Sequence, residues 1–266
     1  MSIRVPTPLH GWRVLAGEVG IVTLGVLIAL GAQQAVSEWV WRSDVRQAEH
    51  QLTAESLDNF QYAAERVMVQ PCIDAQIDRA IALAMAPAAR LTPMAPIPSV
   101  TGDVSVRQPS RPYRDSGWTG VVGDGIASHM DNDRRDLYAS AYTQIANLRE
   151  QTSAGDDTIN RLNLLLYPIE LTPDVRAHLI EDLSAEKRNG RLMTLVGVQI
   201  MDQLWALGKA PSAPLIETFL TTSGTLKLCR DKQLPLGNWR ATLQVSRNEA
   251  ITWNTRLAQY VKRPSR

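Results

Sequence analysis

Ser184 and Lys187 form a Ser-x-x-Lys string, with the lysine one helical turn after the serine. In serine acyl-enzymes such a pair supplies the nucleophile and an amine that helps to activate it. The companion strings Ser-Asp-Asn and Lys-Thr-Gly are absent from the sequence, and the pair lies in a polar stretch of a predicted helix. This spacing alone does not predict a catalytic serine.

Three further groups are of types that bind phosphate or metal ions. The glycines of 120–125 resemble a fragment of a phosphate loop, but no predicted strand precedes them and no Gly-Lys-Ser/Thr follows. The acidic residues of 131–136 lack the glycine and closing glutamate of a calcium loop, which favours an acidic helix start. His50, His129 and His178 have no metal-ligand spacing. We therefore expect neither an enzyme nor a cofactor.

The segment Val14 to Val36 predicts a transmembrane helix. A helix rises about 1.5 Å per residue, so about 20 apolar residues cross a bilayer core of roughly 30 Å. Val19 to Ala32 carries no charged residue. Trp12 precedes the segment and Trp39 and Trp41 follow it, as expected for aromatic anchors at the two membrane interfaces.

The charges that flank this segment predict its orientation. Arg4 and Arg13 precede it, whereas three acidic residues outweigh two arginines in 38–49. The positive-inside rule then places the N-terminus in the cytoplasm. A cleaved signal peptide is the alternative, with small residues near a possible cut at Ala29, Gly31 and Ala32. Helical patterning that continues past the segment favours an uncleaved anchor.

Glu18 is the one carboxylate inside this apolar segment. It lies near the cytoplasmic end, where it can reach the headgroups and pair with Arg13. The alternative is that Glu18 faces another transmembrane helix, because carboxylates in hydrocarbon usually face a partner or water. Small residues with the four-residue spacing that permits close helix packing are Ala16 and Gly20, and Gly25 and Ala29.

Composition excludes one class of partner and indicates a source. The formal net charge of +1 gives no electrostatic basis for nucleic-acid binding. Arginine far outnumbers lysine, which is typical of GC-rich bacterial genomes. Together with the anchor, this predicts a bacterial inner-membrane protein whose large C-terminal domain lies in the periplasm.

Both cysteines, Cys72 and Cys229, belong to the predicted exported domain. An even number of cysteines in an oxidising compartment favours a disulfide. Proline before the first and a polar run after the second suggest that both lie at the ends of elements. Two buried free thiols are the alternative.

Apolar periodicity predicts an all-α exported domain. One stripe continues from the membrane segment, and its members are Val45, Ala48, Leu52, Ser56, Phe60, Ala63 and Val67. Pro71 is expected to interrupt this helix, which resumes over 72–86. Residues 87–131 are rich in proline and glycine and predict a long loop. That loop is either a flexible surface excursion or an ordered flap that uses Tyr113 and Trp118.

The second half of the domain predicts further helices over 134–166, 173–207 and 215–222. Thr172 and Pro173 form a helix start and Gly208 a helix end. The C-terminal segment has a heptad seam formed by Trp239, Leu243, Ser246, Ala250, Trp253, Leu257 and Tyr260. The organisation is thus a cytoplasmic tail (1–13), a transmembrane helix (14–36) and an exported bundle of four or five helices (37–266).

The runs Gly17 to Val22 and Leu24 to Leu30 carry a resemblance to known proteins. They are similar to the anchor of a group of uncharacterised bacterial single-pass membrane proteins that begin with a Gly-Glu-Val helix. The later layout, with Trp118 followed by an acidic helix start and Leu137-Tyr138, resembles the same group. The resemblance implies a membrane anchor and a helical exported domain, and it carries no activity or site residue.

Two functions fit these features. The first is a non-enzymatic scaffold or accessory subunit of a membrane complex, which contacts lipid and meets another membrane protein or a second copy through the transmembrane helix. The second is a ligand-sensing periplasmic bundle. Since only about 13 residues are predicted on the cytoplasmic side, a sensor of this kind signals through a partner.

Overall fold

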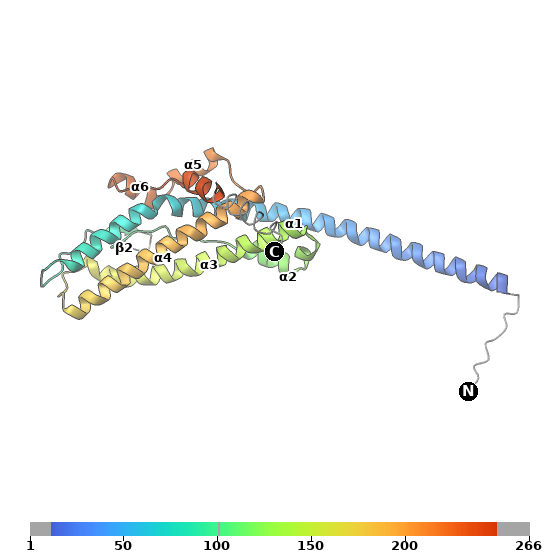
Figure 1. Cartoon of the computed structure of the whole chain (residues 1–266), viewed down its shortest axis with the longest axis horizontal. Helices are drawn as coiled ribbons and strands as arrows, with labels where there is room; N and C mark the ends of the chain where they lie inside the picture. The colour runs from blue at the N-terminus through green and yellow to red at the C-terminus, as the bar shows by residue number, and fades with distance from the viewer. Residues whose placement is uncertain (1–11, 101, 249–266) are drawn as a thin grey trace, which may run out of the picture.

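A computed structural model of the chain describes residues 12–100 and 102–248, with side chains from residue 16 onward. The chain is predominantly helical, which confirms the all-α prediction, and one short hairpin is the exception. Figure 1 shows a bundle and one helix whose N-terminal part extends far beyond it. The predicted tail residues 1–11 and the seam residues Ala250, Trp253, Leu257 and Tyr260 lie outside the described residues.

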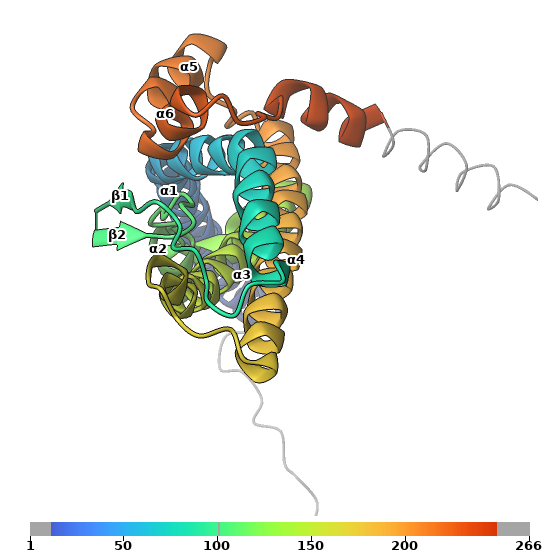
Figure 2. The ribbon, with the colours of Figure 1, turned by 90° about the vertical axis from the view of Figure 1, so that its left-hand side faces the viewer.

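Helix α1 is a single helix of 74 residues, Trp12–Met85. Of the helices described, it is the one long and apolar enough to cross a membrane. Its apolar N-terminal part is fully exposed, whereas its core residues begin at Ala48 and Leu52. The predicted interruption at Pro71 is not a break, since the helix continues through the proline. Figure 2 shows instead that α1 changes direction, as prolines cause helices to do.

Helices α3 (Asn132–Leu162) and α4 (Pro173–Ala206) complete the bundle, and α4 packs against both α1 and α3. Thr172 caps α4 by accepting a hydrogen bond from the Val175 amide, and Gly208 follows its end at a φ of 71°. Both predicted signals are therefore confirmed. Asp131 caps α3 in the same way as Thr172 caps α4.

The described residues of 87–131 do not form one long loop. They contain strands β1 (Ile97–Ser99) and β2 (Gly102–Val104), which pair antiparallel. Helix α2 (Ser116–Gly123) and the 3₁₀ helix η1 (Ile126–His129) follow. Between β2 and α2, residues 104–115 leave β2 and form no further helix or strand; we call them the extended segment. This segment contacts α1 through Asn59 and the end of α3 through Leu162.

The order of this segment comes from contacts distant in sequence. Asn59 on α1 donates to the Arg114 carbonyl and accepts from its amide, at 2.7 and 3.0 Å. Tyr113 is buried, and Trp118 stacks on two tyrosines of α3, Tyr138 and Tyr142, with ring centroids 5.6 and 5.9 Å away. Tyr113 and Trp118, the residues named for an ordered flap, therefore both pack against other parts of the chain.

Helices α5 (Ala213–Thr221) and α6 (Gly224–Asp231) contact α1 and each other. Figure 1 shows them along the flank of α1, away from its exposed part. Residues 239–248 are also helical, and the seam residues Trp239 and Leu243 are buried there. The described residues after α4 therefore pack along α1, where Cys229 and Trp239 contact it.

Candidate functional site

The exposed part of α1 is the first candidate site. Its large apolar side chains between Val19 and Val36 are 52% to 75% exposed. An apolar surface of this length needs lipid or another protein to cover it. The side chain of Arg13, the alternative partner of Glu18, lies outside the described part.

The five residues predicted to contact a membrane partner do not share one face. With 3.6 residues per turn, successive residues are about 100° apart around the helix. Glu18, Gly25 and Ala29 then lie on one face, whereas Ala16 and Gly20 lie on the opposite one. All five residues are exposed. The glycines leave open space, since a Cβ added at Gly20 or Gly25 would meet no described atom within 4 Å.

The three predicted tryptophan anchors have different surroundings. Trp12 begins α1, and its side chain lies outside the described part. Trp39 is exposed, as an interfacial anchor requires. Trp41 stacks on His129 of η1, with centroids 3.9 Å apart and planes 11° from parallel. The bundle therefore contacts α1 at Trp41, the second of the two tryptophans that follow the apolar segment.

Polar and charged side chains inside the bundle, buried or partly buried, form a second candidate site, which we call the polar layer. Its members are Glu65, Arg66, Gln70, Gln108, Arg111, Asp156, Glu186 and Asn189. Glu65 of α1 is fully buried. Arg111 of the extended segment binds both of its oxygens, at 2.6 and 2.9 Å. This is the two-bond geometry by which guanidinium and carboxylate pair most strongly.

Arg66 is also buried, being 1% exposed, but it lacks such a pair. Its Nη1 donates to Gln108 Oε1 at 3.2 Å, whereas Nε and Nη2 contact no acceptor among the described residues. The edge that binds a carboxylate in Arg111 is therefore unpaired in Arg66. Burial lowers the pKa of Arg66, and the nearby Glu186 and Tyr113 oppose that shift.

Two acids of α3 and α4 complete the layer. Burial raises the pKa of Glu186, against the positive charge of Arg66. Burial also raises the pKa of Asp156, and the polar side chains of Gln108 and Ser110 oppose that shift. The negative charge of Asp156 also raises the pKa of Glu186. The interior therefore favours the protonated form of these carboxyls.

Glycines let the helices approach closely around the polar layer. A Cβ at Gly155 of α3 would lie 3.1 Å from Gln108 Nε2 and 3.3 Å from Asn189 Nδ2. A Cβ at Gly190 of α4 would lie 2.5 Å from Gln70 Nε2. Gly155 is thus a buried packing position within a continuous helix.

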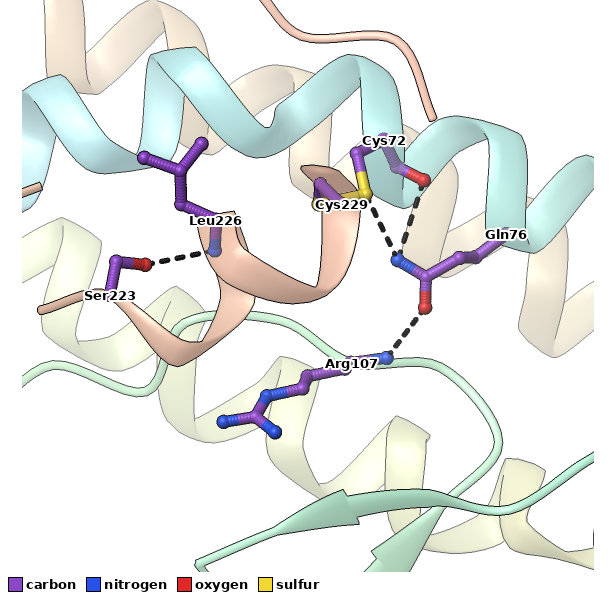
Figure 3. The surroundings of a disulfide bond; sticks show 6 residues. All are labelled: Cys72, Gln76, Arg107, Ser223, Leu226 and Cys229. Carbon is purple, nitrogen blue, oxygen red and sulfur yellow. Dashed lines mark hydrogen bonds between the residues drawn. A yellow bond between two sulfur atoms is a disulfide. The ribbon is translucent and has the colours of Figure 1, made fainter. Parts of the chain in front are cut away.

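Cys72 and Cys229 form the predicted disulfide, with Cα atoms 5.9 Å apart. Figure 3 shows Gln76 beside it. The Gln76 amide donates to the Cys72 carbonyl and sulfur at 3.4 Å each, and its oxygen accepts from the Arg107 backbone amide at 3.0 Å. One side chain therefore links α1 and its disulfide to the extended segment.

The residues considered for catalysis or metal binding have structural contacts. Lys187 forms an ion pair with Asp78 of α1. His178 is exposed beside Glu181, and His129 stacks on Trp41. Within the described part, no group of three His, Cys, Asp or Glu residues is placed to hold a metal ion.

The polar layer gave no sequence signal, because Glu65 and Arg66 lie between apolar stripe residues and resemble an ordinary solvated helix face. Their partners are more than 40 residues away in the chain.

Comparison of the chain with protein-family models, with curated proteins and with solved structures found no match.

Proposed function

We propose that this chain is a single-pass bacterial inner-membrane protein whose periplasmic helical domain is a non-enzymatic scaffold or accessory subunit of a membrane complex. One observation carries the proposal. Helix α1 passes without interruption from an exposed apolar segment into the core of the bundle. A partner that binds the membrane segment would therefore be held at a fixed position relative to the periplasmic domain.

The face that carries Glu18 supplies the partner contact. A carboxylate within the span has an energetic cost in hydrocarbon that a polar group on a second helix offsets. Gly25 and Ala29 share that face and permit close approach of backbones. The partner is then a second copy or another membrane protein with a donor at the same depth, and the opposite face contacts lipid.

Site-specific photo-crosslinking in membranes tests this proposal. A benzoylphenylalanine in place of Ala29 lies on the Glu18 face, and the same group in place of Leu27 lies at a similar depth on the opposite face. We expect a defined crosslinked protein from position 29 and lipid adducts alone from position 27. Equal crosslinking from both positions, or protein adducts from neither, would contradict the proposal.

Membrane topology is tested separately with reporter fusions. Alkaline phosphatase fused after residue 266 is expected to be active, because it folds with its disulfides in the periplasm. The same reporter fused ahead of residue 1 of the full chain is expected to be inactive. The reverse result would contradict the proposed orientation but leave the partner contact testable.

A further inference from the structure

A cavity of about 520 Å³ lies between the turn that joins α4 to α5 and the helical residues 239–248. Its size falls within the roughly 300–1,000 Å³ typical of small-molecule sites. Unlike the polar layer, it has mainly apolar and aromatic walls. The lining residues used below are Trp205, Pro211, Trp239, Arg240, Leu243 and Arg247.

Two indole rings form the aromatic part of the cavity. Trp239 is 8% exposed and packs edge-on against Phe60 of α1, with centroids 6.0 Å apart, so its position is fixed by the core. Trp205 at the end of α4 is 44% exposed, which is high for so large an apolar side chain. Leu243 and Pro211 add aliphatic surface between them. These walls suit a flat, apolar molecule.

The charged residues that line the cavity are both arginines, Arg240 and Arg247. Arg240 lies over the Trp239 ring at 5.4 Å and pairs with Glu217 at 2.6 Å. Arg247 lies over the Trp205 ring at 5.0 Å. Glu217 and Asp202, the acids that contact these arginines, do not line the cavity. The charge presented to an occupant is therefore positive.

Arg247 is the more available of the two cations. Its Nε lies 3.4 Å from Asp202 Oδ1, about the limit for a hydrogen bond, whereas Arg240 Nη2 lies 2.6 Å from Glu217 Oε1. A guanidinium held over an indole ring keeps its edge free for a carboxylate. An incoming carboxylate can thus bind Arg247 without breaking a strong ion pair.

We propose that this cavity binds a small aromatic carboxylate. Its ring lies against Trp205 and Trp239, and its carboxylate binds the Arg247 guanidinium. Neutral aromatic molecules share the ring contacts but lack the charge-assisted hydrogen bonds. The site is independent of the membrane partner proposed above, since its lining residues belong to the periplasmic domain.

Calorimetric titration of the full chain in lipid nanodiscs tests the site, with empty nanodiscs as the blank. The probe is 1-naphthoate, and 1-naphthamide is the matched neutral probe. We expect naphthoate to bind about tenfold or more tightly than naphthamide, because charge-assisted hydrogen bonds are stronger than neutral ones. Equal affinities for the two probes would overturn the assignment of the carboxylate site.

Variants locate the binding. Arg247→Gln should weaken naphthoate binding about tenfold or more and leave naphthamide unchanged. Arg191→Gln is the matched control, because Arg191 is also on the surface near one acid, with Nε 3.6 Å from Asp74, but lies outside the cavity. Trp205→Ala should weaken both probes. Unchanged circular dichroism and thermal unfolding show that each variant is folded.

Two results would overturn the proposal. The first is naphthoate binding that Arg247→Gln leaves unchanged. The second is no binding by the full chain together with binding by a chain ended after Asn248, which would assign the cavity to residues 249–266 instead of to a small molecule.

Discussion

The backbone amide of Gly237 donates to the carbonyl of Met68 at 2.8 Å, beside the proline that bends α1. Pro71 has no N–H, so the Val67 carbonyl four residues earlier loses its helical donor. The chain at Gly237 crosses α1 at this point, so close that an added Cβ would lie 2.6 Å from the Val67 oxygen. A C-terminal glycine thus fits against the carbonyls that the proline displaces.

Gly237→Ala should therefore destabilise the domain. The contacted atom is a backbone oxygen that cannot rotate away, so the segment must shift, at a cost of about 1–3 kcal/mol. Denaturant unfolding followed by circular dichroism measures the change. Gly120→Ala is the control, because a Cβ at Gly120 in α2 meets no described atom within 4 Å and alanine favours a helix. Equal stability of the two variants would refute the close approach.

Loss of the disulfide should have a larger effect. The bond joins positions 157 residues apart and fastens α6 to α1 next to the bend. The chain-entropy model gives about 5 kcal/mol for so long a loop, and native disulfides typically contribute about 2–5 kcal/mol. The Cys72→Ser/Cys229→Ser double variant should therefore unfold at a distinctly lower denaturant concentration.

Reductant provides the control for that measurement. Both sulfurs are fully buried, so mild reductant should leave the folded wild type unchanged. It should shift wild-type unfolding toward that of the double variant only when denaturant is also present. A double variant as stable as the wild type would show that the disulfide constrains little.

Local signals in the sequence predicted the ends of the helices and the cysteine pair, whereas contacts between distant segments decided the rest. Thr172 and Gly208 act within one turn of their own helix, so their roles follow from residue type. Pro71 was expected to interrupt α1, but the bent helix is stabilised by Gly237, far away in sequence. The extended segment 104–115 has no periodicity of its own, and its position depends on contacts with α1 and α3.

Replacement of Arg66 should show that Arg66 and Glu186 depend on each other in their effects on the free energy of unfolding. Arg66→Met removes a buried cation and leaves Glu186 without its main positive neighbour. A buried charge that loses its neighbour of opposite sign is destabilised, whereas replacing both groups with neutral ones removes that cost. We expect Arg66→Met to destabilise strongly and Arg66→Met/Glu186→Gln to recover part of the loss. Additive effects in a double-mutant cycle would show that the two residues are not coupled.

Glu186 should also make stability depend on pH. Burial raises its pKa in the folded state above the ordinary value of about 4.3, so the folded chain binds more protons than the unfolded chain between those two values. The contribution of Glu186 is therefore most favourable below about pH 4 and declines as pH rises through its folded pKa. Asp156, whose pKa is also raised, changes stability in the same direction.

Glu186→Gln removes this titration while keeping the shape of the side chain. Relative to the wild type, the variant should gain stability as the pH rises from 5 to 7.5, by roughly 1 kcal/mol for each unit of folded pKa shift spanned. Denaturant unfolding at several pH values measures the difference. Glu181→Gln is the control for removal of a carboxyl from α4, because Glu181 lies on the same helix but is exposed. A pH-independent difference between Glu186→Gln and the wild type would show that the Glu186 carboxyl is ionised throughout this range.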